Sequence, residues 1–216
     1  MVDRSAVIVA ESYSSTFAQV KATLDFKGKS LIQHIMDAVS PIVDEVIVVA
    51  QSEEQAKKYA ECLEPDTRFA INPNDIQGHL GAALAGFEAC KEKSSLLLSS
   101  DYLLVSPIVV DLLFEMCPGK TAVVPRWPNQ QTEPLHSVYH TKSALKAGQI
   151  ALEDGLFSLD ALIENLGGVR YVSTLAIQEF DPELKTFFKV ETPLDLKMAE
   201  TLAQEKPWKL REKRKR

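Results

Sequence analysis

The chain of 216 residues is long enough for one large domain or at most two small ones, and its apolar fraction of 45% and charged fraction of 25% are ordinary for a globular protein. No run of about 18 apolar residues occurs, so we expect no membrane span. The apolar run near the N-terminus is short and typical of a strand rather than a signal peptide. Three widely spaced cysteines indicate neither a disulfide scaffold nor a metal site, which favours a cytoplasmic protein.

The net charge of −6 is unevenly distributed along the chain. The C-terminal stretch KLREKRKR, residues 209–216, holds six basic residues and one acidic residue, so the remainder carries about −11. An acidic body argues against general nucleic-acid binding. We interpret residues 1–206 as a single domain and residues 207–216 as a solvated basic tail. A contact of the tail with a polyanion or a partner protein is the alternative.

Apolar runs and capping residues predict alternating strands and helices in the first half of the chain. Strands are expected over 6–10, 44–50, 67–72 and 94–101. Helices are expected over 31–39, 53–63, 81–91 and 108–116. Their starts are marked by Ser30, by the capping-box pair Ser52 and Gln55, and by Ser106 with Pro107. The helix over 81–91 is rich in small residues, which suits close packing.

The second half continues the alternation. Strands are expected over 120–127, 134–140, 169–175 and 186–190. Helix caps are expected at Thr141, Ser158 and Thr192, the last with Pro193 and Asp195 completing a capping box. Strands that alternate with helices predict a mostly parallel sheet in a three-layer α/β/α architecture.

Ligands of open α/β sheets bind beyond the carboxyl ends of the strands. This rule selects the loop after Ala10, the loop over residues 72–80, Asp101 and the loop after Val190. Asp101 is of special interest because it follows the buried strand LLLSS, although a strand-end aspartate is often only a turn former. The loop after Ala10 is short, polar and free of glycine.

The segment over residues 6–34 resembles, without a gap, the opening of the molybdenum cofactor guanylyltransferase family. That family follows its first strand with L-A-G-G-x-S-x-R-M-G-x-x-K and then L-L-P-x-x-G-K-P-L-I-x-H. Here the stretch reads VAESYSSTFAQVKATLDFKGKSLIQH. Four later segments, IQGHLGAALAG, LLLSSDYLLV, EPLHSVYH and FFKVETPLDL, are similar to later motifs of the family and occur in the same order.

The resemblance implies a Rossmann-like nucleotidyltransferase that moves GMP from GTP to molybdopterin, with Mg²⁺ as cofactor and pyrophosphate as the second product. It assigns Asp101 to Mg²⁺ and Lys21 to the triphosphate, which makes both residues catalytic. The loop at Val9, Ala10 and Glu11 would contact the nucleotide through its backbone. Asn72 stands where the family has a residue that contacts guanine or ribose. Asp75 is the other candidate for this contact. For either residue, a purely structural role in a turn is the alternative.

Nucleotidyl transfer explains these residue types. A phosphate of the acceptor attacks the α-phosphorus, and because this nucleophile is already an anion, no strong general base is required. Catalysis then consists of positioning and charge neutralisation. A lysine, backbone N–H groups and a carboxylate that holds Mg²⁺ supply both.

The sequence departs from the family pattern at the site rather than on the scaffold. Glu11 and Ser12 replace two glycines, Thr16 replaces an arginine, and Lys189 and Glu191 replace two asparagines of the late signature. A Glu11 carboxylate about 4 Å from a phosphate charge would cost roughly 4 kcal/mol at an effective dielectric near 20.

Two alternatives therefore stay open. The chain could be a non-catalytic relative that keeps the fold as a binding or regulatory module. It could also act on another phosphorylated acceptor. In each case we expect a monomer or a weak homo-oligomer.

Overall fold

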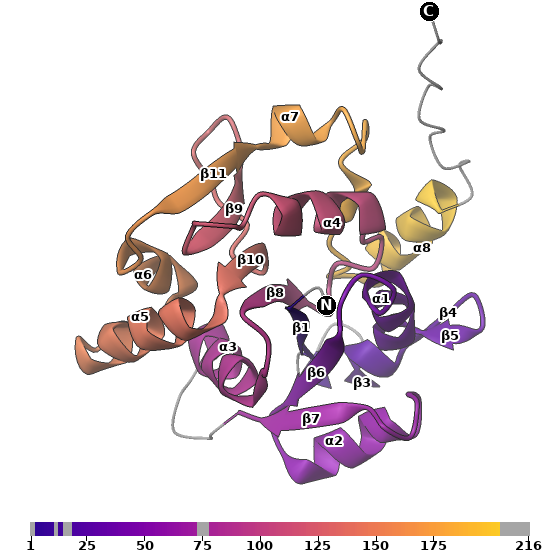
Figure 1. Cartoon of the computed structure of the whole chain (residues 1–216). Helices are drawn as coiled ribbons and strands as arrows, with labels where there is room; N and C mark the ends of the chain where they lie inside the picture. Colours follow the sequence, from indigo (N-terminus) through magenta and orange to yellow (C-terminus); the bar gives the residue numbers. More distant parts are fainter. Residues whose placement is uncertain (1–2, 11–12, 15–18, 73–77, 204–216) are drawn as a thin grey trace, which may run out of the picture.

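The computed structural model describes residues 3–10, 13–14, 19–72 and 78–203, and these contain a seven-stranded sheet in the order β11-β9-β10-β8-β1-β6-β7 (Figure 1). The strands are β1 (Arg4–Val9), β6 (Glu45–Ala50), β7 (Arg68–Ile71), β8 (Ser94–Ser99), β9 (Ala122–Arg126), β10 (His136–His140) and β11 (Val169–Ser173). All pairings in this sheet are parallel except those of β10 with β8 and β9. The mostly parallel sheet predicted from the sequence is confirmed.

Helices cover both faces of the sheet (Figure 1). Their bounds are α1 (Leu31–Val39), α2 (Glu53–Ala60), α3 (Gly78–Ala89), α4 (Pro107–Glu115), α5 (Thr141–Glu153), α6 (Leu159–Glu164), α7 (Thr174–Ile177) and α8 (Pro193–Leu202). None of the helices within the described ranges has the length and apolar character needed to cross a membrane. The basic tail predicted at 207–216 lies outside the described residues, as do Glu11, Ser12 and Thr16.

Two apolar cores lie on opposite faces of the sheet. Ile8 belongs to a core with buried residues of α1, α2 and α4, whereas Val7 belongs to a core with residues of α3, α5 and α6. Successive strand residues point to opposite faces, and a strand that is apolar at both positions is therefore buried on both sides. This arrangement confirms the three-layer α/β/α architecture.

Short elements complete the chain near the carboxyl edge of the sheet. Two small ribbons form from β2 (Tyr13–Ser14) with β3 (Gln19–Val20) and from β4 (Asp25–Phe26) with β5 (Lys29–Ser30). Two 3₁₀ turns, η1 (Lys21–Thr23) and η2 (Lys185–Phe187), follow β3 and precede α8.

Most predicted helix starts are confirmed. The side chains of Ser30, Ser52 and Ser158 each accept a backbone N–H at the start of α1, α2 and α6, and Thr192 with Asp195 forms the full capping box of α8. The pair at α2 is only half of the predicted box, because the Gln55 amide oxygen accepts from the N–H of Gln51 at 2.7 Å instead of that of Ser52.

Two predictions of secondary structure are wrong. Residues 186–190 form no strand: the N–H of Thr186 donates to the Asp181 carboxylate at 2.8 Å and the N–H of Phe187 to the Leu184 carbonyl at 3.0 Å, so the chain turns as η2. The cap of α5 is His140 rather than Thr141, since the imidazole Nδ1 accepts from the N–H of Ser143.

The close packing predicted for the small-residue helix is present where α3 crosses β1 and β6. Gly86 lies so close to the sheet that an added Cβ would collide with Val7 and lie 3.1 Å from a methyl group of Val49. We expect Gly86→Ala to lower the free energy of unfolding by about 1–3 kcal/mol, because overpacking outweighs the better helix propensity of alanine. Urea unfolding monitored by circular dichroism measures the difference.

Gly167→Ala is the matched control, because no atom outside its own neighbourhood lies within 4 Å of an added Cβ there. Its unfolding free energy should stay within about 0.5 kcal/mol of wild type. A Gly86→Ala variant as stable as wild type would contradict the packing described.

Candidate functional site

The carboxyl ends of β1 and β8 meet at one point of the sheet. Val9 and Ser99 are register partners, and the N–H of Ser100 donates to the Val9 carbonyl at 2.9 Å. The N–H of Asp101 then donates to the Ser99 hydroxyl at 3.2 Å, which fixes the turn that follows β8. The two strand ends selected from the sequence, at Ala10 and at Asp101, are therefore neighbours.

The structure brings together the two residues predicted to be catalytic. Lys21 opens η1, and its Nζ forms an ion pair with Oδ1 of Asp101. Both side chains are buried, with 6% of Lys21 and 11% of Asp101 exposed. Burying two charges costs desolvation energy that their attraction offsets only in part. A buried pair at the ligand-binding edge of the sheet is therefore better explained by a role in binding than by stability.

The backbone of Asp101 fixes a distant segment of the chain. Its carbonyl accepts hydrogen bonds from the N–H of Leu103 at 3.0 Å and from the N–H of Val190 at 2.9 Å. The second bond attaches the segment that follows η2 to the end of β8. The late loop selected from the sequence, after Val190, thus begins beside Asp101.

The remaining nucleotide-binding candidates lie along the same edge. Ala10 is buried, and its N–H donates to the Val49 carbonyl at 3.1 Å, so this N–H is committed to the sheet. Asn72 follows β7 and lies three strands from Asp101, roughly 14 Å at the usual strand spacing. Glu11 and Asp75 lie outside the described residues.

Asn72 carries an unused polar atom. Its backbone N–H donates to the Ala50 carbonyl at 2.8 Å, while its side-chain Oδ1 is buried and has no hydrogen-bond partner among the residues that the structure describes. An unpaired buried carbonyl is costly, and a donor from a ligand would satisfy it.

A second cluster begins at Tyr102, the residue after Asp101, and of its members only Lys189 was singled out from the sequence. Glu133 is buried, and its carboxylate accepts from the Tyr102 hydroxyl at 2.6 Å and from the Trp127 indole N–H at 2.7 Å. The Lys189 ammonium lies 3.3 Å from the same carboxylate. Burial raises the pKa of Tyr102, and the Glu133 charge raises it further, so the phenol stays protonated as the donor.

Two sequence signals fall on this cluster: the EPL that opens the similar segment EPLHSVYH, and Lys189, which stands where the late family motif has an asparagine. Trp127 and Lys189 are brought to Glu133 from two other parts of the chain, and Tyr102 comes from the turn after β8. The partners of Glu133 follow from the fold rather than from local spacing.

His136 lies in the wall next to this cluster and is completely buried. Its ring packs edge-on against Tyr102 and Phe187, with ring centroids 5.1 and 4.9 Å apart, and burial, together with the charge of Lys189, lowers its pKa to about 3. The unfolded chain takes up a proton near pH 6.5, whereas the folded chain does so only near pH 3. Stability is therefore complete above pH 6.5 and falls as the pH drops through this window.

Replacing His136 with phenylalanine should flatten this pH dependence. For wild type we expect a loss of up to about 1.4 kcal/mol of unfolding free energy for each pH unit below 6.5, measured by urea titration at pH 7.5, 6.5, 5.5 and 4.5. His79→Gln removes an exposed histidine and should keep the wild-type slope. Equal slopes in His136→Phe and wild type would show that His136 is not the group responsible.

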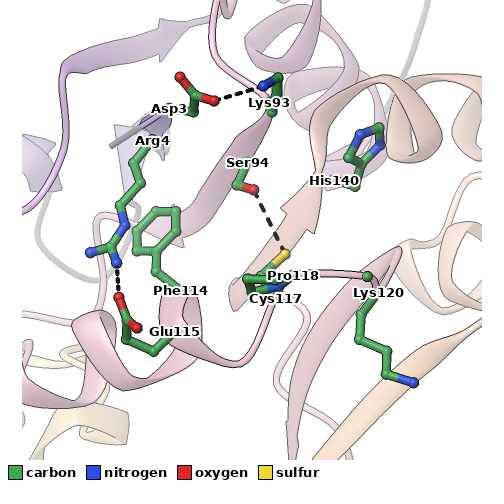
Figure 2. Close-up of a pocket in the computed structure, with 11 residues that line it drawn as sticks. Asp3, Arg4, Lys93, Ser94, Phe114, Glu115, Cys117, Pro118, Lys120 and His140 are labelled. Atoms are coloured by element: carbon green, nitrogen blue, oxygen red, sulfur yellow. Dashed lines mark hydrogen bonds and ion pairs between the residues drawn. The ribbon is translucent and has the colours of Figure 1, made fainter. Parts of the chain in front are cut away.

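A cavity of about 540 Å³ lies at the opposite edge of the sheet, where β1 and β8 begin. Two of its cations are paired: Arg4 lies 2.5 Å from Glu115 and Lys93 lies 2.8 Å from Asp3. Figure 2 shows both pairs. Ligands of such sheets bind at the carboxyl ends of the strands, so this cavity is not the candidate site. Within the described ranges, no group of three histidine, cysteine or acidic side chains forms a preassembled metal site.

Comparison with known proteins gives a consistent result. A family model described as "MobA-like NTP transferase domain" matches residues 6–168. A protein of Methanosarcina mazei named "Probable molybdenum cofactor guanylyltransferase" is 34% identical over 208 residues, which is 94% of this chain and 92% of the relative. A relative from Methanosarcina acetivorans with the same name is 32% identical and covers 89% of this chain and 88% of its own length.

Solved structures agree. The molybdopterin-guanine dinucleotide biosynthesis protein A of Archaeoglobus fulgidus superimposes with a TM-score of 0.77 at 26% identity, covering 93% of this chain and 98% of that one. The 2-C-methyl-D-erythritol 4-phosphate cytidylyltransferase of Thermus thermophilus, at 19% identity and a TM-score of 0.67 over 93% and 98% of the chains, shares the fold. The chain therefore belongs to the MobA-like NTP transferase family and is a nucleotidyltransferase of the Rossmann-like α/β fold.

Proposed function

We propose that this protein transfers GMP from GTP to molybdopterin and releases pyrophosphate. The observation that carries the proposal is the buried Lys21–Asp101 pair at the joined ends of β1 and β8, in a chain that is 34% identical to a relative named as a guanylyltransferase. A buried cation beside a buried carboxylate is suited to a bound triphosphate, whose charge the cation offsets.

The transfer is a displacement at phosphorus. An oxygen of the acceptor phosphate forms a bond to the α-phosphorus of GTP, the bond to the bridging oxygen breaks, and its electron pair leaves with pyrophosphate. Lys21 offsets the charge of the triphosphate as it is held and cleaved. The nucleotide-binding role of Val9, Ala10 and Glu11 stays a proposal, because the Ala10 N–H is bound to the Val49 carbonyl and Glu11 lies outside the described residues. Asn72 would offer its unpaired Oδ1 to a donor of the base or ribose.

We propose Mg²⁺ as the cofactor, with Asp101 as the residue that holds it. The donor set fits: Mg²⁺ keeps several waters and takes one or two carboxylates together with substrate phosphates, and one buried carboxylate stands here at the strand end. Bound with the nucleotide, the ion offsets charge on the phosphate oxygens. Lys21, which contacts the same carboxylate, then fixes the position of the Asp101 side chain.

The non-catalytic alternative is not favoured, because the described part of the site keeps both charged residues in contact. The alternative of another phosphorylated acceptor is tested by the pyrophosphate-release experiment described below. The cytoplasmic location, the single domain with a solvated tail, and the monomer or weak homo-oligomer also remain proposals.

Pyrophosphate release tests the function directly. We expect release only when GTP, Mg²⁺ and molybdopterin are all present, with a much lower rate when CTP or ATP replaces GTP. Omission of each component is the control. Turnover with GTP and a sugar phosphate, but not with molybdopterin, would show that the acceptor is a sugar phosphate instead of molybdopterin. An absence of both turnover and GTP binding would refute the proposal.

A further inference from the structure

Lys189 occupies a fixed position beside the candidate site. The next residue, Val190, donates its N–H to the Asp101 carbonyl at 2.9 Å, so the backbone at Lys189 is attached to the strand end that carries the buried carboxylate. The Lys189 side chain nevertheless remains 41% exposed. It is therefore a cation that solvent, and hence a ligand, can reach, on a residue whose chain neighbour is bonded to Asp101.

The Glu133 carboxylate and the Tyr102 ring hold the ammonium of Lys189 in place. Its Nζ lies 3.3 Å from Oε2 of Glu133 and 5.2 Å from the centroid of the Tyr102 ring. A flexible lysine that is held in this way has lost much of its rotamer freedom before any ligand binds. The ammonium is thus preorganised.

Glu133 is itself rigidly held. Its side chain is only 9% exposed, and its carboxylate accepts from the Tyr102 hydroxyl and from the Trp127 indole at 2.6 and 2.7 Å. Neutral donors satisfy the carboxylate oxygens without Lys189. An ion pair with a half-exposed lysine adds little to stability, so the position of Lys189 is not explained by the fold alone.

We propose that Lys189 binds the phosphate of the acceptor and that Glu133 is the residue that positions it; this inference rests on the proposed function. The acceptor phosphate is an anion that must approach the α-phosphorus held near Asp101. An exposed ammonium one residue from the Asp101–Val190 hydrogen bond gives it a charge-assisted hydrogen bond at that place. The late family motif that residues 187–196 resemble has an asparagine where Lys189 stands.

The test is steady-state kinetics with molybdopterin varied at saturating GTP and Mg²⁺. Lys189→Met should raise KM for the acceptor at least tenfold and leave KM for GTP within twofold. Lys189→Arg, which keeps the charge, should recover most of the acceptor affinity. Raising the salt concentration should weaken acceptor binding in wild type and have a smaller effect in Lys189→Met.

Glu133→Gln tests the positioning role. The amide oxygen still accepts one hydrogen bond, but the charge that holds the ammonium is gone, so KM for the acceptor should rise by a smaller factor than in Lys189→Met. Lys93→Met is the matched control, because it removes a lysine paired with an acid at the opposite edge of the sheet (Figure 2). It should leave both KM values unchanged.

The outcomes separate the two proposals. Wild-type turnover together with an unchanged acceptor KM in Lys189→Met overturns this inference and leaves the proposed function intact. An equal rise of both KM values in Lys189→Met overturns it as well, since the lysine would then serve the nucleotide. No turnover by wild type overturns the proposed function and this inference with it.

Discussion

Replacing Asp101 with asparagine is expected to lower kcat for pyrophosphate release by about a thousandfold or more at saturating GTP and Mg²⁺. Asparagine has nearly the shape of aspartate but no charge, so it can neither hold Mg²⁺ well nor keep Lys21 in its ion pair. Since the nucleophile is already an anion, charge neutralisation is the main contribution of the protein to this step. The loss should therefore appear in kcat, measured by initial rates.

Asp111→Asn is the matched control for this experiment. Asp111 lies on α4, its side chain is 57% exposed, and it pairs with Arg4, which lines the cavity at the opposite edge of the sheet. Its loss should leave kcat within about twofold of wild type. An Asp101→Asn protein that is folded by circular dichroism and keeps a tenth of the wild-type rate would contradict the role given to Asp101.

Replacing Lys21 with methionine is expected to lower the free energy of unfolding by about 3–5 kcal/mol, because it leaves Asp101 as a buried charge without the cation. The double variant Lys21→Met/Asp101→Asn should be more stable than Lys21→Met alone, since it removes the charge that the single variant leaves behind. Urea unfolding of the wild type, both single variants and the double variant gives the coupling energy of the pair.

The exposed pair Lys29–Asp37 provides the comparison, with side chains 54% and 42% exposed. A double-mutant cycle with Lys29→Met and Asp37→Asn should give a coupling energy below about 1 kcal/mol, because solvent screens the two charges. A Lys21–Asp101 coupling no larger than this would mean that the site pair is not buried as described.

The part of the site nearest the sheet could be predicted from the sequence. Parallel strands share one carboxyl edge, so the ends of the strands at Ala10 and at Asp101 could be placed at the same edge once the strands were recognised. That β1 and β8 are direct neighbours follows from the structure. Lys21 was selected by its spacing in the resemblance, and the structure places its Nζ in contact with Asp101, while its role toward the triphosphate stays a prediction. Regular hydrogen bonding between strands makes such positions predictable.

The cluster around Glu133 could not be predicted in the same way. It depends on contacts between Glu133, Tyr102 and Lys189, which lie far apart in the sequence, and no local pattern encodes such contacts. The neighbouring residues 186–190 have the composition of a strand, but the Asp181 carboxylate takes the N–H of Thr186, and nearby backbone carbonyls take those of Phe187 and Phe188.

The cap of α5 shows another limit. Thr141 is the better cap by residue preference, yet the imidazole of His140 accepts the N–H of Ser143, and the Thr141 hydroxyl is bound to the Glu92 carbonyl at 2.8 Å. Tertiary hydrogen bonding thus overrode local preference. The departures at Glu11, Ser12 and Thr16 lie outside the described residues, and their effect on nucleotide affinity stays a prediction from charge and size.

The most direct test of the central claim is a calorimetric titration of GTP with Mg²⁺ into wild type and Lys21→Met. If the Lys21–Asp101 edge holds the nucleotide, wild type will bind one equivalent of GTP in a Mg²⁺-dependent manner. The folded Lys21→Met variant will then bind at least tenfold more weakly, because the buried cation proposed to offset the triphosphate charge is gone. No binding by wild type, or equal affinities in the two proteins, would contradict the account.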